Sequence, residues 1–440
     1  MKRIWVRRTA AVLTFFLMWA LVEHAARFFT NPLKQAWPSI VEDRKRVEGT
    51  ITTAFIGASL FRNGVIPAAF DETMAGQSFN DSTSGQTIAL TEYALEDIAE
   101  NNPLNLLLVD VSVNRLMKEA DESGRIAKYA VFCQMLSWRA RLNLLKNAFT
   151  LDEVPMTLLT SARDQLHFFW GTLSNRLSPE YVKTYLRYGY VPDPLYPSGS
   201  MGYTPDNGVN PEGGIPFNEP EGEMEGVAAE NLESLTRIIT YCRERGITPV
   251  LLSMPTTDTC LLYFNQYEAL QAPVRALAER EGALYLDFNL SKFRNMLTDA
   301  NFLDERHMNA SGAERFTPYL TEVLHKALSG EDVSDLFYAS WDEAAAAIHR
   351  VSSVGLEVAE AGGGDALRAY SLEGTGVTPV YRFFARRQDA PEGEYRALES
   401  SGGICLLTSL ESGAYTVRVE AYSDPAASCD AYCERDVQIH

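Results

Sequence analysis

The chain has 440 residues, 46% of them hydrophobic and 22% charged, which is the composition of a globular protein long enough for more than one domain. Its formal net charge of −19 argues against a nucleic-acid-binding protein, because such a chain cannot neutralise a row of phosphates. The same charge disfavours adhesion of the folded part to an anionic membrane. Six cysteines are too few for a disulfide scaffold, although Cys429 and Cys433 are close enough in sequence to pair.

The N-terminal segment is basic and then apolar. An apolar run from 9 to 22 follows four basic residues, Lys2, Arg3, Arg7 and Arg8. A cleaved signal peptide is one interpretation, but no A-x-A cleavage site is evident after the run. We favour an uncleaved signal anchor over residues 1–29. Both interpretations place the rest of the chain outside the cytoplasm, with the basic end inside.

Short apolar segments alternate with segments of helical periodicity between residues 50 and 328. The predicted strands are 51–56, 77–79, 104–111, 249–254 and 283–287. The predicted helices are 88–100, 231–245, 267–280 and 313–327. Near-continuous apolar strands separated by helices predict an α/β domain, at 30–330, with a parallel sheet covered on both faces. Such sheets place their reacting groups at the carboxyl ends of the strands.

Two stretches interrupt this alternation. Residues 126–186 are expected to form a helical insertion packed on the sheet. Residues 188–226 are rich in glycine and proline, with four aromatic residues interspersed, Tyr190, Tyr196, Tyr203 and Phe217. A loop of this length inside a compact domain is usually a lid or a binding loop. A disordered surface excursion is the alternative that the composition leaves open.

The character of the chain changes after residue 330. Residues 331–351 read as an acidic linker, and 352–440 as a β-sandwich accessory domain. Its predicted strands alternate with period two, at 380–386, 393–398, 403–408 and 414–421. The spacing of Tyr381, Tyr395 and Tyr415 resembles the immunoglobulin-like modules of bacterial surface proteins, and we expect these tyrosines to anchor a core rather than bind a ligand.

A small turn follows the first predicted strand. Its sequence, Phe55-Ile56-Gly57-Ala58-Ser59, can expose a serine hydroxyl at the carboxyl edge of the sheet, where backbone N–H groups face an oxyanion. Taken alone, such a turn is more often structural than catalytic.

A second polar pair precedes the last helix of the domain. Asp304 and His307 stand three residues apart, so the carboxylate can orient the imidazole and fix the tautomer that accepts a proton. The simpler interpretation is a helix entry capped by Asn309 or Ser311, and that role can coexist with catalysis.

Together, the Gly-x-Ser turn on the first strand and the Asp-x-x-His before the last helix resemble the first and last sequence blocks of the SGNH (GDSL-like) hydrolase family. The resemblance covers residues 50 to 328 and implies a flavodoxin-like, three-layer α/β fold. It implies Ser59 as nucleophile, His307 as general base and Asp304 as the acid that orients it. Ala58 stands where the strict GDSL form has aspartate.

The middle blocks of the family are matched less closely. The family's oxyanion glycine follows the second strand, where Gly85 is the best match. Its oxyanion asparagine follows the third strand, where Asn114 is a candidate, and a capping or turn role for Asn114 stays open. This departure from the pattern, with the N-terminal anchor, resembles the cell-envelope branch of the family, which includes D-alanine transfer proteins and alginate or peptidoglycan O-acetylation proteins.

The helix-Gly-strand-Pro unit at 242–255 is similar to one common in that branch. The branch implies transfer or removal of small acyl groups on cell-wall glycans, beside a multi-pass membrane O-acyltransferase as partner. No cofactor or metal is predicted, since no glycine-rich phosphate loop follows a strand and the other histidines lack ligands at metal spacing. The rival hypothesis is a non-catalytic surface protein that binds glycan through its aromatic loop.

Overall fold

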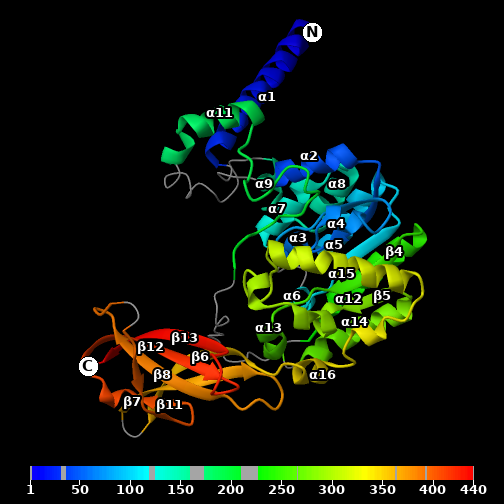
Figure 1. Cartoon of the computed structure of the whole chain (residues 1–440). Helices are drawn as coiled ribbons and strands as arrows, with labels where there is room; N and C mark the ends of the chain where they lie inside the picture. Colours follow the sequence, from blue (N-terminus) through cyan, green and yellow to red (C-terminus); the bar gives the residue numbers. More distant parts are fainter. Residues whose placement is uncertain are drawn as a thin grey trace.

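The chain is organised as an N-terminal helix, an α/β unit and a C-terminal β unit (Figure 1). The computed structural model describes residues 2–30, 36–117, 124–158, 173–209, 226–264, 266–361, 364–391 and 394–439. The N-terminal helix α1 (Lys2–Thr30) projects away from the α/β unit. Its segment Trp5–Glu23 is long and apolar enough to cross a membrane and has no buried residue, as in a membrane anchor or a signal sequence.

The α/β unit is built on a five-stranded parallel sheet in the order β2-β1-β3-β4-β5. The strands are β1 (Ile51–Ile56), β2 (Gln77–Asn80), β3 (Leu106–Asp110), β4 (Thr248–Ser253) and β5 (Leu284–Asp287). All five predicted strands are thereby confirmed to within two residues at each end. In doubly wound sheets of this order, the crevice that receives a ligand lies at the carboxyl ends of β1 and β3.

Helices cover both faces of this sheet. One face carries α5 (Ile88–Glu100), α12 (Ala229–Glu244) and α14 (Tyr267–Glu281), and the other carries α3 (Ser59–Gly64), α4 (Pro67–Asp71) and α15 (Ala310–Leu328). Neighbouring residues of a strand point to opposite faces. Ile56 therefore packs into the core with α5, and Phe55 into the core with α3 and α15. The two cores hold the end of β1 rigidly, at the point where the candidate site begins.

The predicted helical insertion packs differently from the expectation. Its helices α7 (Arg125–Gln134) and α8 (Trp138–Asn147) contact α5 and α2 (Trp37–Val47) rather than the sheet, because α5 already covers that face. Further along, α9 (Val154–Leu158) follows, and α11 (Pro179–Tyr188) lies beside the end of α1. There the rings of Phe28 and Tyr181 are 5.6 Å apart. The part of the predicted insertion at 159–172 lies outside the described residues.

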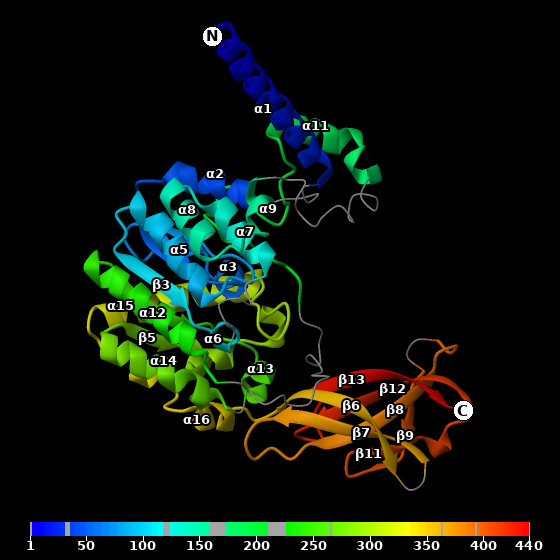
Figure 2. The same cartoon turned by 180° about the vertical axis from the view of Figure 1, so that it is seen from behind.

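The C-terminal unit contains two four-stranded antiparallel sheets, in the orders β10-β11-β7-β6 and β13-β12-β8-β9 (Figure 2). The strands are β6 (Val351–Ala361), β7 (Gly364–Glu373), β8 (Val380–Arg387), β9 (Arg396–Leu398), β10 (Ser400–Ser401), β11 (Ile404–Leu406), β12 (Gly413–Tyr422) and β13 (Ala431–Ile439). One hydrophobic core joins the two sheets, with Leu367 of β7 and Val417 of β12 both fully buried. The pattern analysis missed β6, β7, β10 and β13.

The tyrosines of this unit differ in burial, and its two C-terminal cysteines are unpaired. Tyr415 is buried in the core, as expected, and Tyr381 packs against it. Tyr395 instead donates its hydroxyl to Glu434 at the surface. Cys429 and Cys433 are both free thiols, and Cys433 lies on β13 with its side chain in the core. Their nearness in sequence therefore does not produce a disulfide in this structure.

The segment predicted as a linker is folded onto the α/β unit. It contains the short helices η6 (Ser334–Leu336) and α16 (Trp341–Ala346). Ala345 and Ile348 are buried in a cluster with Leu261 and Leu270 of the α/β unit. The acidic residues that suggested a linker occupy the outer side of this packed segment, so the two units meet through a hydrophobic contact.

Candidate active site

Three polar side chains meet at the carboxyl edge of the sheet. Ser59 is the first residue of α3, directly after β1, and its Oγ lies 2.7 Å from Nε2 of His307, 248 positions later in the chain. Nδ1 of His307 lies 2.8 Å from Oδ2 and 3.0 Å from Oδ1 of Asp304. All three residues are partly exposed. The structure thus places the predicted serine, histidine and aspartate in one hydrogen-bonded chain that solvent can reach.

The direction of this chain follows from hydrogen-bond chemistry. An ionised carboxylate only accepts hydrogen bonds, so the ring proton of His307 lies on Nδ1, facing Asp304. The lone pair of Nε2 then accepts the hydroxyl proton of Ser59. This is the arrangement in which an imidazole can remove a proton from a serine hydroxyl during attack on a carbonyl group.

The loop around His307 holds the carboxylate in place. Oδ1 of Asp304 accepts the backbone N–H groups of Arg306 at 2.9 Å and of His307 at 2.7 Å. The N–H of Leu303 donates to the carbonyl of His307 at 2.7 Å and closes the loop. Asn309 caps α15 by accepting the N–H of Gly312, so the capping role considered from the sequence is present beside the site residues.

These contacts change the acidity of Asp304. Partial burial works to raise the pKa of its carboxyl, but the hydrogen bonds from the His307 ring and from two backbone N–H groups outweigh burial and lower the pKa from 3.8 to about 2. The carboxylate therefore remains ionised, and able to orient His307, at pH values well above 2.

A stability measurement checks this assignment. A carboxyl whose pKa is lower in the folded than in the unfolded chain stabilises the fold above its unfolded pKa, and this contribution is lost as the pH falls from 3.8 towards 2. Asp304→Asn has no such group. In urea titrations the wild type should exceed Asp304→Asn in stability at pH 5, and the gap should close towards pH 2. A gap that is constant with pH contradicts the lowered pKa.

The turn that carries Ser59 is fixed by a buried carboxylate that the sequence analysis did not single out. Oδ2 of Asp110, at the end of β3, accepts the N–H of Ala58 at 3.2 Å. Asp110 is fully buried and lies 3.8 Å from the guanidinium of the buried Arg115. A Cβ on Gly57 would stand 2.4 Å from the Cβ of Asp110, so only glycine allows this approach. The sequence signal that could have indicated this role is a single carboxylate at the end of an apolar strand.

The loop after β2 runs beside the same turn. The N–H of Thr83 donates to the carbonyl of Gly57 at 3.1 Å, and Asp81 in this loop pairs with the buried Arg44 of α2 at 3.3 Å. Gly85 lies in an exposed turn at φ +73°, where glycine is favoured, and its role as an oxyanion donor stays a prediction. The side chain of Asn114, on α6 (Val113–Met117), lies outside what the structure describes, so its role also stays a prediction.

The described part of the glycine- and proline-rich loop forms a strap that runs from α3 to the start of α15. The N–H of Thr204 donates to the carbonyl of Arg62 on α3 at 2.9 Å. At its far end, the backbone carbonyl of Asp206 accepts the N–H of Ala310, three residues after His307, at 2.7 Å. Tyr196 is buried, with its hydroxyl on Asp43 at 2.7 Å. The strap therefore connects the serine helix with the histidine loop, while Phe217 lies outside the described residues.

A small cavity is lined by sequence neighbours of Ser59 and His307 and by none of the three site residues themselves. It lies between Leu60, which follows Ser59, and Arg306, which precedes His307, and its volume is about 10 Å³. The rest of its lining is Ser112, Val113, Thr256, Cys260, Leu261, Phe264, Tyr267 and Asn289. A space of this size admits about one water molecule, or a group of similar volume.

Comparisons with known proteins give structural similarity at low identity. No protein-family model matches the chain, and no curated protein is similar to it. One similar structure is a protein of Bacteroides fragilis that is described as an acylhydrolase. It is 10% identical to this chain, with a TM-score of 0.33, and the similarity covers 67% of this chain and 100% of that one. A GDSL-like lipase of Bacteroides thetaiotaomicron is 10% identical with a TM-score of 0.31, over 68% of this chain and 99% of that one. At such values the similarity carries no argument about function, which must come from the site itself.

Proposed function

We propose that the protein is a serine-dependent ester hydrolase or acyltransferase of the SGNH type. The observation that carries this proposal is the hydrogen-bonded chain from Ser59 through His307 to Asp304, at 2.7 and 2.8 Å. Two features support it further. The three residues lie at the carboxyl end of β1, where sheets of this order bind ligands. The buried carboxylate of Asp110 accepts a hydrogen bond from the turn before Ser59 and holds that turn in place.

The reaction would proceed in two steps. His307 removes the hydroxyl proton of Ser59 as Oγ attacks the ester carbonyl, and then donates that proton to the departing alcohol. The acyl group is now esterified to Ser59. His307 next removes a proton from water or from a sugar hydroxyl, whose oxygen attacks the acyl-serine carbonyl. The bond from that carbonyl to Oγ then breaks, and His307 returns the proton to Oγ, which restores the Ser59 hydroxyl. Asp304 keeps the imidazole in the required tautomer throughout. Water gives hydrolysis, and a sugar hydroxyl gives transfer.

The oxyanion formed in each step needs hydrogen-bond donors. We propose the backbone N–H of Ser59, at the start of α3, together with the donors expected from the family pattern, the N–H of Gly85 and the side chain of Asn114. The loop that carries Gly85 is bonded to the serine turn through Thr83, which supports a shared position.

The cellular setting in this proposal follows from α1. Its apolar, exposed segment would anchor the chain, with the basic N-terminus in the cytoplasm and the α/β unit outside. Acylated cell-envelope glycans or glycopolymers would then be the substrates, a multi-pass membrane O-acyltransferase a partner, and the C-terminal β unit a β-sandwich accessory module. We take the small cavity between Leu60 and Arg306 as the pocket for the acyl chain, and its volume of about 10 Å³ then favours a short group such as acetyl.

The size of that cavity gives a test of the proposal. Hydrolysis of p-nitrophenyl acetate should exceed that of the hexanoate by about tenfold or more in kcat/KM, because the longer chain does not fit. Phe264→Ala removes part of the cavity wall and so enlarges the cavity, which should lower the ratio of acetate to hexanoate hydrolysis. Phe132→Ala, an equally half-buried phenylalanine away from the site, is the matched control and should leave the ratio unchanged. No turnover of any ester by the folded protein would favour the glycan-binding scaffold instead.

A further inference from the structure

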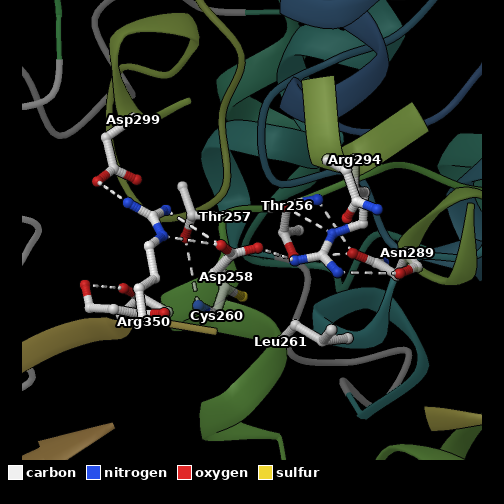
Figure 3. Close-up of polar contacts among 12 residues, drawn as sticks. Thr256, Thr257, Asp258, Cys260, Leu261, Asn289, Arg294, Asp299 and Arg350 are labelled. Atoms are coloured by element: carbon white, nitrogen blue, oxygen red, sulfur yellow. Dashed lines mark hydrogen bonds and ion pairs between the residues drawn. The ribbon is translucent and has the colours of Figure 1, made fainter. Parts of the chain in front are cut away.

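Arg350 occupies the junction between the two folded units. It immediately precedes β6, the first strand of the C-terminal unit, and its guanidinium reaches back to the α/β unit (Figure 3). Nη2 and Nε lie 3.0 and 3.2 Å from Oδ2 of Asp258. Nη1 lies 3.8 Å from Oδ2 of Asp299. One side chain thus joins two carboxylates that are far apart in the sequence of the α/β unit.

The first carboxylate leads to one end of the histidine loop. Asp258 is the first residue of α13 (Asp258–Tyr263), and its Oδ1 pairs at 2.7 Å with Arg294, which is almost fully buried. The preceding residue, Thr257, donates its N–H and its hydroxyl to the carbonyl of Glu305, at 3.1 and 2.8 Å. Glu305 lies between Asp304 and His307. The start of α13 is therefore hydrogen-bonded to the loop that carries Asp304 and His307.

The second carboxylate leads to the other side of the same loop. Asp299 begins the short helix η5 (Asp299–Asn301). The side chain of Asn309 donates to the carbonyl of Ala300 at 2.8 Å, and its N–H donates to the carbonyl of Asn301 at 3.1 Å. These two hydrogen bonds join the residues before the Asp304–His307 loop to the residue that follows it. Arg350 is therefore linked to both supports of the segment that carries Asp304 and His307.

The C-terminal unit is itself fixed at this junction. The hydroxyl of Thr259, on α13, donates to the carbonyl of Ser352 at 2.9 Å. The N–H of Val351 donates to Asp430, in the loop before β13, at 3.2 Å. Leu372 of β7 packs against the cluster that contains Leu261 of α13. The β unit and α13 are thus joined by a hydrogen bond and by a shared hydrophobic cluster.

From these contacts we propose that Arg350 is a positioning residue, through which the docked C-terminal unit holds the Asp304–His307 loop in register with Ser59. The role in catalysis rests on the proposed function, whereas the hold on the loop does not. The C-terminal unit is then part of the scaffold of the active site as well as an accessory module. Arg350 touches no reacting atom and acts only through Asp258 and Asp299.

The test uses the full chain with three variants. Arg350→Ala should lower kcat for p-nitrophenyl acetate by about 10- to 100-fold at an unchanged KM, since small displacements of a catalytic group cost rates of this order. Arg350→Lys should recover part of this loss, because an ammonium reaches one carboxylate but cannot span two. Arg368→Ala removes an exposed ion pair with Glu357 inside the β unit and is the matched control, with no expected change.

Amide hydrogen exchange separates this proposal from the proposed function. In Arg350→Ala the amides of Leu303 and Asn309 should exchange faster, while those of β1 keep their protection. That result supports the positioning role even if the wild type hydrolyses no ester, in which case the proposed function alone fails. Unchanged exchange at Leu303 and Asn309 overturns the positioning role. Equal acceleration in β1 and in the loop also overturns it, since Arg350 would then be a general stability residue.

Discussion

Replacing Ser59 by alanine should abolish ester turnover while the protein stays folded. Without Oγ no acyl-serine can form, so kcat should fall by about 10³-fold or more. Ser59 is partly exposed, and within the described residues its hydroxyl makes one hydrogen bond, to His307, so the loss in unfolding free energy should be within about 1 kcal/mol. Release of acetate from an acetylated glycan, measured beside thermal melts, checks both statements.

The histidine gives the control for this result. His307→Ala should be nearly as damaging as Ser59→Ala, and the double variant little worse than either, because nucleophile and base act as one unit. Additive losses, or unchanged turnover in a folded Ser59→Ala protein, would contradict the acyl-serine mechanism. A Ser59→Ala protein that melts much earlier would identify Ser59 as a structural turn residue.

Replacing Asp110 by alanine should cost more stability than any change within the triad. Removal of the carboxylate leaves Arg115 as a buried charge that has lost its anionic partner and leaves the N–H of Ala58 without its acceptor. Breaking a buried pair from one side typically costs about 3–5 kcal/mol. The midpoint of urea unfolding should fall accordingly, and turnover should fall in the fraction that remains folded, because the turn before Ser59 is released.

Two further variants make the Asp110 result specific. Asp110→Asn keeps an oxygen that can accept from Ala58 but loses the charge opposite Arg115, so it should lose less stability than alanine does. Glu357→Ala removes an exposed carboxylate that also pairs with an arginine and should change stability by less than about 1 kcal/mol. Equal losses for Asp110→Ala and Glu357→Ala would show that the buried carboxylate does not hold the turn.

Regular elements of the α/β unit could be predicted because their signals are local. The apolar run at 51–56 and the periodicity at 88–100 coincide with β1 and α5 as observed. β6 and β7 were missed because Gly355 and several polar residues interrupt their alternation. The close antiparallel pairing of β6 with β7 fixes them instead, and that pairing is a tertiary property. The packing of the predicted linker, 331–351, on the α/β unit was not predicted, since its few buried apolar residues stand among acidic ones in the sequence.

Within the site, the predictable residues were those with a motif. Ser59, Asp304 and His307 stand in short patterns at strand and helix ends, and the resemblance of these patterns to the SGNH family implied that the three residues meet. Asp110 and Arg350 carry no motif, because their importance arises from contacts between segments far apart in the chain. A sequence shows that a charge ends an apolar strand. It does not show which backbone N–H group will donate a hydrogen bond to that carboxylate.

Labelling with a fluorophosphonate tests the central claim most directly, because only a serine activated by a neighbouring base reacts. The folded wild type, treated with the probe and digested, should give one modified peptide, with the adduct on Ser59. His307→Ala should label far more slowly, and Ser59→Ala should not label there at all. An unlabelled wild type, or an adduct on a different serine, would contradict the assignment of Ser59 as the nucleophile.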